Sequence, residues 1–220
     1  CYLGEHVLMS RTLRRRMLKD RYGFECICSI CTTEFDEFSA RACQACGARV
    51  VVLPGRDTAP PSCCQEGPVL LEGNEEDSEM RAVLLREEWE ALMLDKRADL
   101  DEFAERTRLS IKRLTSKGLQ HHVAMVRYRI LLVEVLATLV KRRQRAKQFQ
   151  AAQTLADEGY DIMKAVIEWF QSEWNPLKSC AAMCTVEAVV AMEGALQCIR
   201  SSKNRKRVAE LRQFLQGHPE

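Results

Sequence analysis

The sequence has 220 residues, of which 46% are apolar, so it can bury a core as one domain or as two. Its 33 Lys and Arg residues almost balance its 31 Asp and Glu residues, and the overall charge gives no reason to expect nucleic acid or a membrane as a partner. No run of apolar residues is long enough to cross a bilayer.

The cysteines are unevenly distributed along the chain. Eight of the 11 cysteines precede residue 65, with close C-x-C and C-x-x-C spacings among them, and three lie in a later stretch of helical character. This spacing favours bound metal in a reducing compartment over a secreted disulfide framework. Because the first residue is Cys rather than Met, we expect that the natural N-terminus is missing, and targeting signals cannot be judged.

Residues 1–21 predict a short strand followed by a basic amphipathic helix. The strand is Cys1-Tyr2-Leu3, and the helix carries Leu13, Met17 and Leu18 at helical spacing among arginines. One strand and one helix bury too little surface to fold alone. We therefore expect this stretch to be the end of a larger domain that begins upstream.

The next stretch brings three thiols into six residues, Cys26, Cys28 and Cys31. Zinc takes four ligands in a tetrahedron, and a C-x-C-x-x-C turn supplies three thiolates. The fourth ligand must come from a distant residue or from a part of the protein outside this sequence. Ahead of the turn, Tyr22 and Phe24 are two positions apart, so in an extended segment their rings lie on the same side, beside the metal.

Residues 32–77 contain a second group of cysteines. Cys43 and Cys46 precede an expected strand at 49–53, and Cys63 and Cys64 follow a proline-rich loop. This order is typical of a zinc knuckle or of half a zinc ribbon. Adjacent cysteines do not easily point at the same ion, so two interpretations stay open: a second zinc site, or reduced cysteines that bind no metal.

From residue 78 onward the pattern predicts helices almost throughout. Ser78 is the expected N-cap of the first, and Asn175-Pro176 the expected end of the fourth. His121 and His122 are expected to cap a helix or to lie on the surface, and Cys180, Cys184 and Cys198 to be small core residues. The expected helices cover residues 78–93, 98–114, 122–147, 149–174, 178–199 and 203–215. The fold class is mainly α, either an antiparallel helical array of the TPR-like kind or a plain helical bundle.

The first 31 residues resemble the end of the catalytic domain of the SET and MYND domain (SMYD) family of protein-lysine methyltransferases. The residues that carry the resemblance are Cys1-Tyr2-Leu3, the basic helix, and Tyr22-x-Phe24-x-Cys26-x-Cys28-x-x-Cys31. In that family a helical, TPR-like domain follows, as residues 78–220 would. The cysteine-rich stretch 32–77 is longer than in compact members and is similar to the divergent branch.

The resemblance implies methyl transfer from S-adenosylmethionine to lysine of histone or non-histone proteins. It assigns Tyr2 to the catalytic and cofactor-binding tyrosine, Phe24 to the aromatic residue that packs on the cofactor's adenine, and Cys26, Cys28 and Cys31 to the post-SET zinc. The family's fourth zinc ligand comes from an upstream motif that this sequence lacks. The glycine-rich cofactor-binding start is also missing, so we expect the chain alone to bind cofactor poorly or not at all.

These expectations divide the chain into four parts. Residues 1–21 are the end of a SET domain, 22–31 the post-SET zinc turn, 32–77 a zinc-knuckle-like insertion, and 78–220 a helical TPR-like domain. The expected partners are a protein substrate, and a peptide or chaperone that binds the helical domain. Neither a membrane nor nucleic acid is expected as a partner. The expected localisation is the cytoplasm and the nucleus. The alternative function is a helical protein-interaction module whose zinc is only structural.

Overall fold

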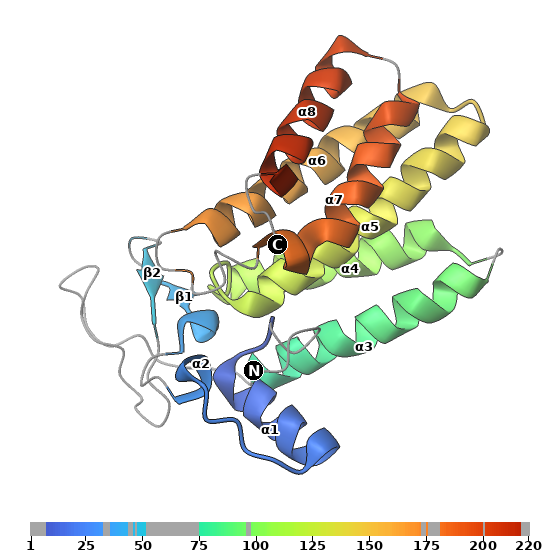
Figure 1. The fold of residues 1–220 in the computed structure, drawn as a ribbon. Helices are drawn as coiled ribbons and strands as arrows, with labels where there is room; N and C mark the ends of the chain where they lie inside the picture. The colour runs from blue at the N-terminus through green and yellow to red at the C-terminus, as the bar shows by residue number, and fades with distance from the viewer. Residues whose placement is uncertain are drawn as a thin grey trace. The chain divides into compact units, whose positions relative to one another are not determined.

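The computed structural model describes residues 8–32, 36–43, 46, 48–51, 75–95, 98–172, 175, 181–199 and 201–216. The described chain is mainly helical (Figure 1). Among these residues, none of the helices combines the length and the hydropathy that crossing a membrane requires. The expected strand at Cys1-Tyr2-Leu3 lies outside the described residues.

The chain divides into two compact units. Unit 1 consists of residues 1–94 and 111–127, and unit 2 of residues 95–110 and 128–220. The elements that lie wholly in unit 1 are α1 (Arg11–Tyr22), α2 (Ser29–Thr32), the 3₁₀ turn η1 (Glu37–Ser39), β1 (Arg41–Ala42), β2 (Arg49–Val50) and α3 (Glu75–Leu94). Those of unit 2 are α6 (Phe149–Gln171), α7 (Ala181–Cys198) and α8 (Ser202–Gln216), while α4 (Leu100–Ser116) and α5 (Val123–Arg145) contribute to both.

Helix α1 confirms the predicted basic helix. It begins after Ser10, whose Oγ accepts a hydrogen bond from the Leu13 N–H at 3.4 Å, and it ends at Gly23. Gly23 adopts φ +70°, a left-handed conformation that costs glycine little, and its N–H donates to the Lys19 carbonyl. The apolar side of α1 packs through Leu13 against Val83 of α3. This packing fixes the helix that leads into the cysteine turn.

A buried carboxyl group joins the start of α1 to α3 and to the start of α5. The Ser10 N–H donates to Glu79 Oε2 at 2.9 Å, and His122 Nε2 lies 3.5 Å from Glu79 Oε1. His122 Nδ1 accepts from the Ala124 N–H, which confirms His122 as a cap but not as a surface residue, since it is fully buried. Burial raises the pKa of Glu79 to about 7 and, together with the charge of Arg41, lowers the pKa of His122 to about 3.

The two short strands form an antiparallel hairpin. Arg41 pairs with Val50 and Ala42 with Arg49, and the Ala42 N–H donates to the Gly118 carbonyl at 2.7 Å. Gly118 has φ +70°, and a Cβ there would lie 3.3 Å from the Ala42 oxygen, so this approach requires glycine. Of the expected strand at 49–53, residues 49–50 form β2, residue 51 lies beyond it, and residues 52–53 are outside the described part.

Most predicted helices are present, with shifted ends. Helix α3 begins at Glu75, so the prediction that Ser78 is its N-cap is wrong. A capping side chain contributes only about 1 kcal/mol, and good helix formers such as Glu ahead of it can extend the helix past it. Helix α6 ends at Gln171, earlier than the expected stop at residue 174, and the Asn175 side chain donates to the Trp169 carbonyl beyond that end.

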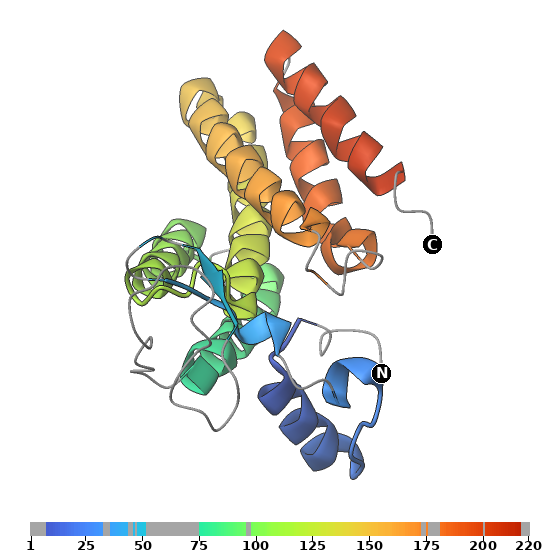
Figure 2. The ribbon, with the colours of Figure 1, turned by 90° about the vertical axis from the view of Figure 1, so that its left-hand side faces the viewer.

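In unit 2, helices α6, α7 and α8 lie side by side, and α7 and α8 run antiparallel (Figures 1 and 2). Arg207 of α8 bonds Asp157 of α6 and lies 4.4 Å from the centre of the Tyr160 ring. The prediction that the late cysteines are core residues is wrong for Cys198, which is exposed at the end of α7, while Cys184 is half-buried and Cys180 lies outside the described residues.

Candidate metal centre

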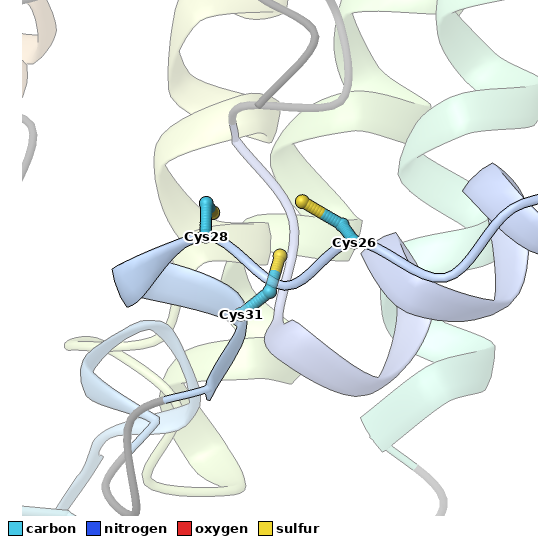
Figure 3. A group of neighbouring side chains, drawn as sticks. All are labelled: Cys26, Cys28 and Cys31. Carbon is cyan, nitrogen blue, oxygen red and sulfur yellow. The ribbon is translucent and has the colours of Figure 1, made fainter.

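Three thiols converge where the chain leaves α1. Cys26 lies in the loop after α1, Cys28 immediately precedes α2, and Cys31 lies within α2. Their Sγ atoms all lie within 4.8 Å of one another, and Figure 3 shows the three side chains gathered around one space. We call Cys26, Cys28 and Cys31 the thiol cluster. Its three sulfurs come from six consecutive residues, as the sequence predicted.

Local backbone structure explains why the sulfurs meet. The Cys31 N–H donates to the Cys28 carbonyl at 2.9 Å, and the Thr32 N–H donates to the same oxygen at 3.0 Å. These bonds close the short turn of α2 and place residue 31 back over residue 28. Leu18 of α1 packs against Cys26 and Cys31, so the apolar side of α1 is in contact with the thiol cluster.

The donor set of the thiol cluster fits zinc. Zn–S bonds of about 2.3 Å in a tetrahedron separate the sulfurs by about 3.8 Å. The observed limit of 4.8 Å is about 1 Å wider, a difference that small side-chain rotations can remove. Thiolates are soft ligands and suit zinc better than magnesium or calcium, which prefer oxygen. Cys26 and Cys31 are buried and Cys28 is half-buried, so the site is also shielded from water.

The thiols of the cluster differ in acidity. Burial raises the pKa of the Cys31 thiol, and the hydrogen bond and positive charge of Arg14 offset only part of that rise. Burial acts in the same direction on Cys28, but hydrogen bonds from the Cys31 backbone and from the neighbouring thiols outweigh it and lower the pKa of Cys28. Cys28 is therefore the thiol of this pair that more readily becomes a metal-binding thiolate.

Arg14 is the residue of this site that the sequence did not reveal. Its guanidinium is buried, and its Nε donates to Cys31 Sγ at 3.3 Å. In the sequence, Arg14 is one of several arginines of a basic amphipathic helix, and such arginines are usually solvated. Its position next to Leu13, a core residue of α1, was the available signal, because it places Arg14 near the edge of the buried side.

The expected cofactor residues are placed only in part. Phe24 is half-buried and packs against the thiol cluster, with its ring centre 6.5 Å from that of Tyr22. Tyr22 is the last residue of α1 rather than part of an extended segment, yet the two rings are neighbours as expected. Tyr2 lies outside the described residues. Ile27 lies between Cys26 and Cys28, and its side chain is 86% exposed, which is unusual for an isoleucine.

The second expected zinc site is described only at two positions. Cys43 directly follows β1 and is buried, and its N–H donates to the Ala48 carbonyl at 2.7 Å. Cys46 is exposed at the turn between β1 and β2. Cys63 and Cys64 lie outside the described residues. A hairpin with cysteines at this turn is compatible with half of a zinc knuckle, and both interpretations from the sequence stay open.

No protein-family model matches the chain, and no curated protein is significantly similar to it in sequence.

Proposed function

We propose that this chain is the C-terminal part of an S-adenosylmethionine-dependent protein-lysine methyltransferase of the SMYD type, with a structural zinc ion bound by the thiol cluster. The observation that supports the proposal is the convergence of three thiols directly after a basic helix, beside a half-buried aromatic residue, Phe24. The resemblance in sequence assigns the same residues to the post-SET segment.

Methyl transfer of this type needs little acid or base chemistry. S-adenosylmethionine supplies a methyl group on a positively charged sulfur, and the target lysine must approach it as a neutral amine, in line and away from water. In the proposal, Phe24 binds the flat adenine ring by stacking, and the phenol of Tyr2 orients the amine. The thiol cluster holds Phe24 in place, because Phe24 packs directly against the cysteines.

The first experiment is metal analysis of the purified 220-residue chain. We expect about one zinc ion per chain to be lost when Cys31 is replaced by serine, which has no soft sulfur ligand. The matched control is Cys198→Ser, because Cys198 is exposed on α7 in unit 2 and its thiol donates to the Gly194 carbonyl of its own helix. A wild-type chain without zinc, or a Cys31→Ser variant with full zinc content, would refute the metal centre.

The second experiment addresses the reaction itself. With the preceding residues of the proposed parent enzyme restored, the protein should transfer radiolabelled methyl from S-adenosylmethionine to protein lysine. Phe24→Ala should raise KM for S-adenosylmethionine about 5- to 150-fold, since stacking on one aromatic ring contributes about 1–3 kcal/mol. If KM is unchanged in a zinc-loaded Phe24→Ala protein, Phe24 is not part of the cofactor site, and the proposed zinc site is unaffected by that result.

The alternative function is a helical protein-interaction module with structural zinc. Two hollows beside α8 favour it: one of about 740 Å³ between α7 and α8, and one of about 570 Å³ between α6 and α8. Apolar residues such as Val208 and Phe214 line them. Such concave, partly apolar surfaces suit a bound peptide segment. A zinc-loaded parent protein that transfers no methyl to any protein substrate would favour this alternative.

A further inference from the structure

Arg14 is enclosed by polar atoms of the cysteine turn. It is only 3% exposed. Its Nε donates to Cys31 Sγ at 3.3 Å, Nη1 to the Met9 carbonyl at 3.1 Å and Nη2 to the Ile30 carbonyl at 3.4 Å. The guanidinium carbon lies 5.5 Å from the centre of the Phe38 ring. One side chain thus touches Met9 ahead of α1, two residues of α2 and the 3₁₀ turn.

These contacts include no carboxylate. Within the described residues, the groups that Arg14 contacts are two carbonyls, an aromatic face and one sulfur. Two other arginines differ from Arg14, because Arg108 is paired with Glu158 and Arg207 with Asp157. A buried guanidinium keeps its charge in proteins, and burying a charge without a counter-ion is costly. Of these contacts with described residues, the one that can become an anion is the sulfur of Cys31.

The negative charge of a metal–thiolate centre would provide the counter-ion for the buried positive charge of Arg14. A divalent metal ion with three thiolates carries a net charge of about −1, and more negative still with a fourth thiolate. We infer that Arg14 is the positioning residue of the thiol cluster: it supplies the counter-charge of the bound metal–thiolate centre and holds Cys31 in it through the N–H···S hydrogen bond. This inference rests on the proposed zinc site and assigns to it a residue outside the cysteine motif.

The same contacts link metal binding to the surrounding fold. By bonding the Met9 and Ile30 carbonyls, Arg14 ties the entry of α1 to α2. A change at Arg14 therefore acts on the metal through Cys31 rather than by removing a ligand. Partners of metal ligands at this distance typically change metal affinity by about 10- to 100-fold when they are removed.

The test measures zinc affinity by competition with a chromophoric chelator, using the whole chain. Arg14→Met should weaken zinc binding about 10- to 100-fold while leaving about one zinc ion per chain at saturation. The control is Arg16→Met, which removes the same charge from an exposed position of α1 and should leave affinity unchanged. Equal affinity of wild type and Arg14→Met overturns the inference and leaves the zinc site intact.

Two further measurements separate a direct role from general damage. Arg14→Lys keeps the charge and should retain more affinity than Arg14→Met; if both lose the same amount, the counter-charge role is refuted even where Arg14→Met folds poorly. With Co²⁺ in place of zinc, loss of the N–H···S bond should shift the sulfur-to-cobalt absorption of Arg14→Met to longer wavelength, because the sulfur electrons are held less tightly. An unshifted band also overturns the inference. A wild type that binds neither metal refutes the proposed zinc site itself.

Discussion

Replacing Glu79 by glutamine should change how the stability of the protein depends on pH. Glu79 is 1% exposed, accepts the Ser10 N–H and faces His122. Burial raises its pKa from an ordinary 4.5 to about 7; the Ser10 hydrogen bond opposes this rise, the charge of Asp36 adds to it, and the charge of Arg127 opposes it. Between these two pH values the folded protein holds a proton that the unfolded chain has lost.

The sign and size of the effect follow from this difference. Because the folded pKa is raised, the contribution of Glu79 to stability is fully present below pH 4.5 and is lost as the pH rises through about 7. At about 1.4 kcal/mol for each pH unit, the loss is about 3 kcal/mol. His122 acts oppositely, since its pKa is lowered from 6.5 to about 3: its contribution is present above 6.5 and is lost as the pH falls.

Comparison with a variant isolates the Glu79 contribution. The pKa of His122 is lowered by burial and by Arg41, neither of which Glu79→Gln removes, so most of the His122 contribution is shared by the two proteins and drops out of their difference. Relative to wild type, the unfolding free energy of Glu79→Gln should increase by about 3 kcal/mol between about pH 4 and about pH 8. Urea unfolding at several pH values, followed by the fluorescence of the buried Trp89 on α3, measures this difference.

The matched control is Glu90→Gln on the same helix. Glu90 is exposed and pairs at the surface with Arg86, so its variant should follow the wild-type pH dependence within about 0.5 kcal/mol. A constant offset between wild type and Glu79→Gln across the whole pH range would refute the reasoning, because it would mean that Glu79 has the same pKa in the folded and the unfolded chain.

Three further perturbations test other parts of the structure. Alanine at Gly118 or at Gly23, both with φ +70°, should destabilise unit 1 by about 1–2 kcal/mol in urea unfolding. The effect should be larger at Gly118, where the new Cβ meets the Ala42 oxygen, than at Gly23, where a new Cβ meets no atom of the other described residues within 4 Å. Asp157→Asn should destabilise unit 2 by about 1.5–3 kcal/mol, because Arg207 loses its charged acceptor. Removing metal with a chelator should speed hydrogen exchange in residues 24–32 and leave α6 to α8 protected.

Each of these predictions has an outcome that contradicts it. Equal losses for the two glycine variants would show that the Ala42 carbonyl moves away readily. An Asp157→Asn protein as stable as wild type would mean that the pair with Arg207 only balances its own desolvation. If the chelator does not change hydrogen exchange in residues 24–32, any bound metal lies elsewhere in the chain.

The helices were largely predictable because helix formation depends on the spacing of neighbouring residues. The apolar residues of α1 recur at helical intervals, and its end at Gly23 follows from the freedom of glycine to adopt positive φ. The ends of other helices were less predictable. Ser78 was expected to begin α3, which starts instead at Glu75, since a single cap is a weak signal beside the propensity of the flanking residues.

The sequence by itself determined the thiol cluster, because three cysteines within six residues can meet through one turn of backbone. Only the tertiary structure decided what surrounds it. Arg14 contacts Cys31 across 17 residues, and Glu79 reaches Ser10 across 69. Local spacing places Arg14 only near the edge of the buried side of α1, and it does not distinguish Glu79 from its neighbours on α3. Their burial, and with it their charge and acidity, depends on how distant segments pack together.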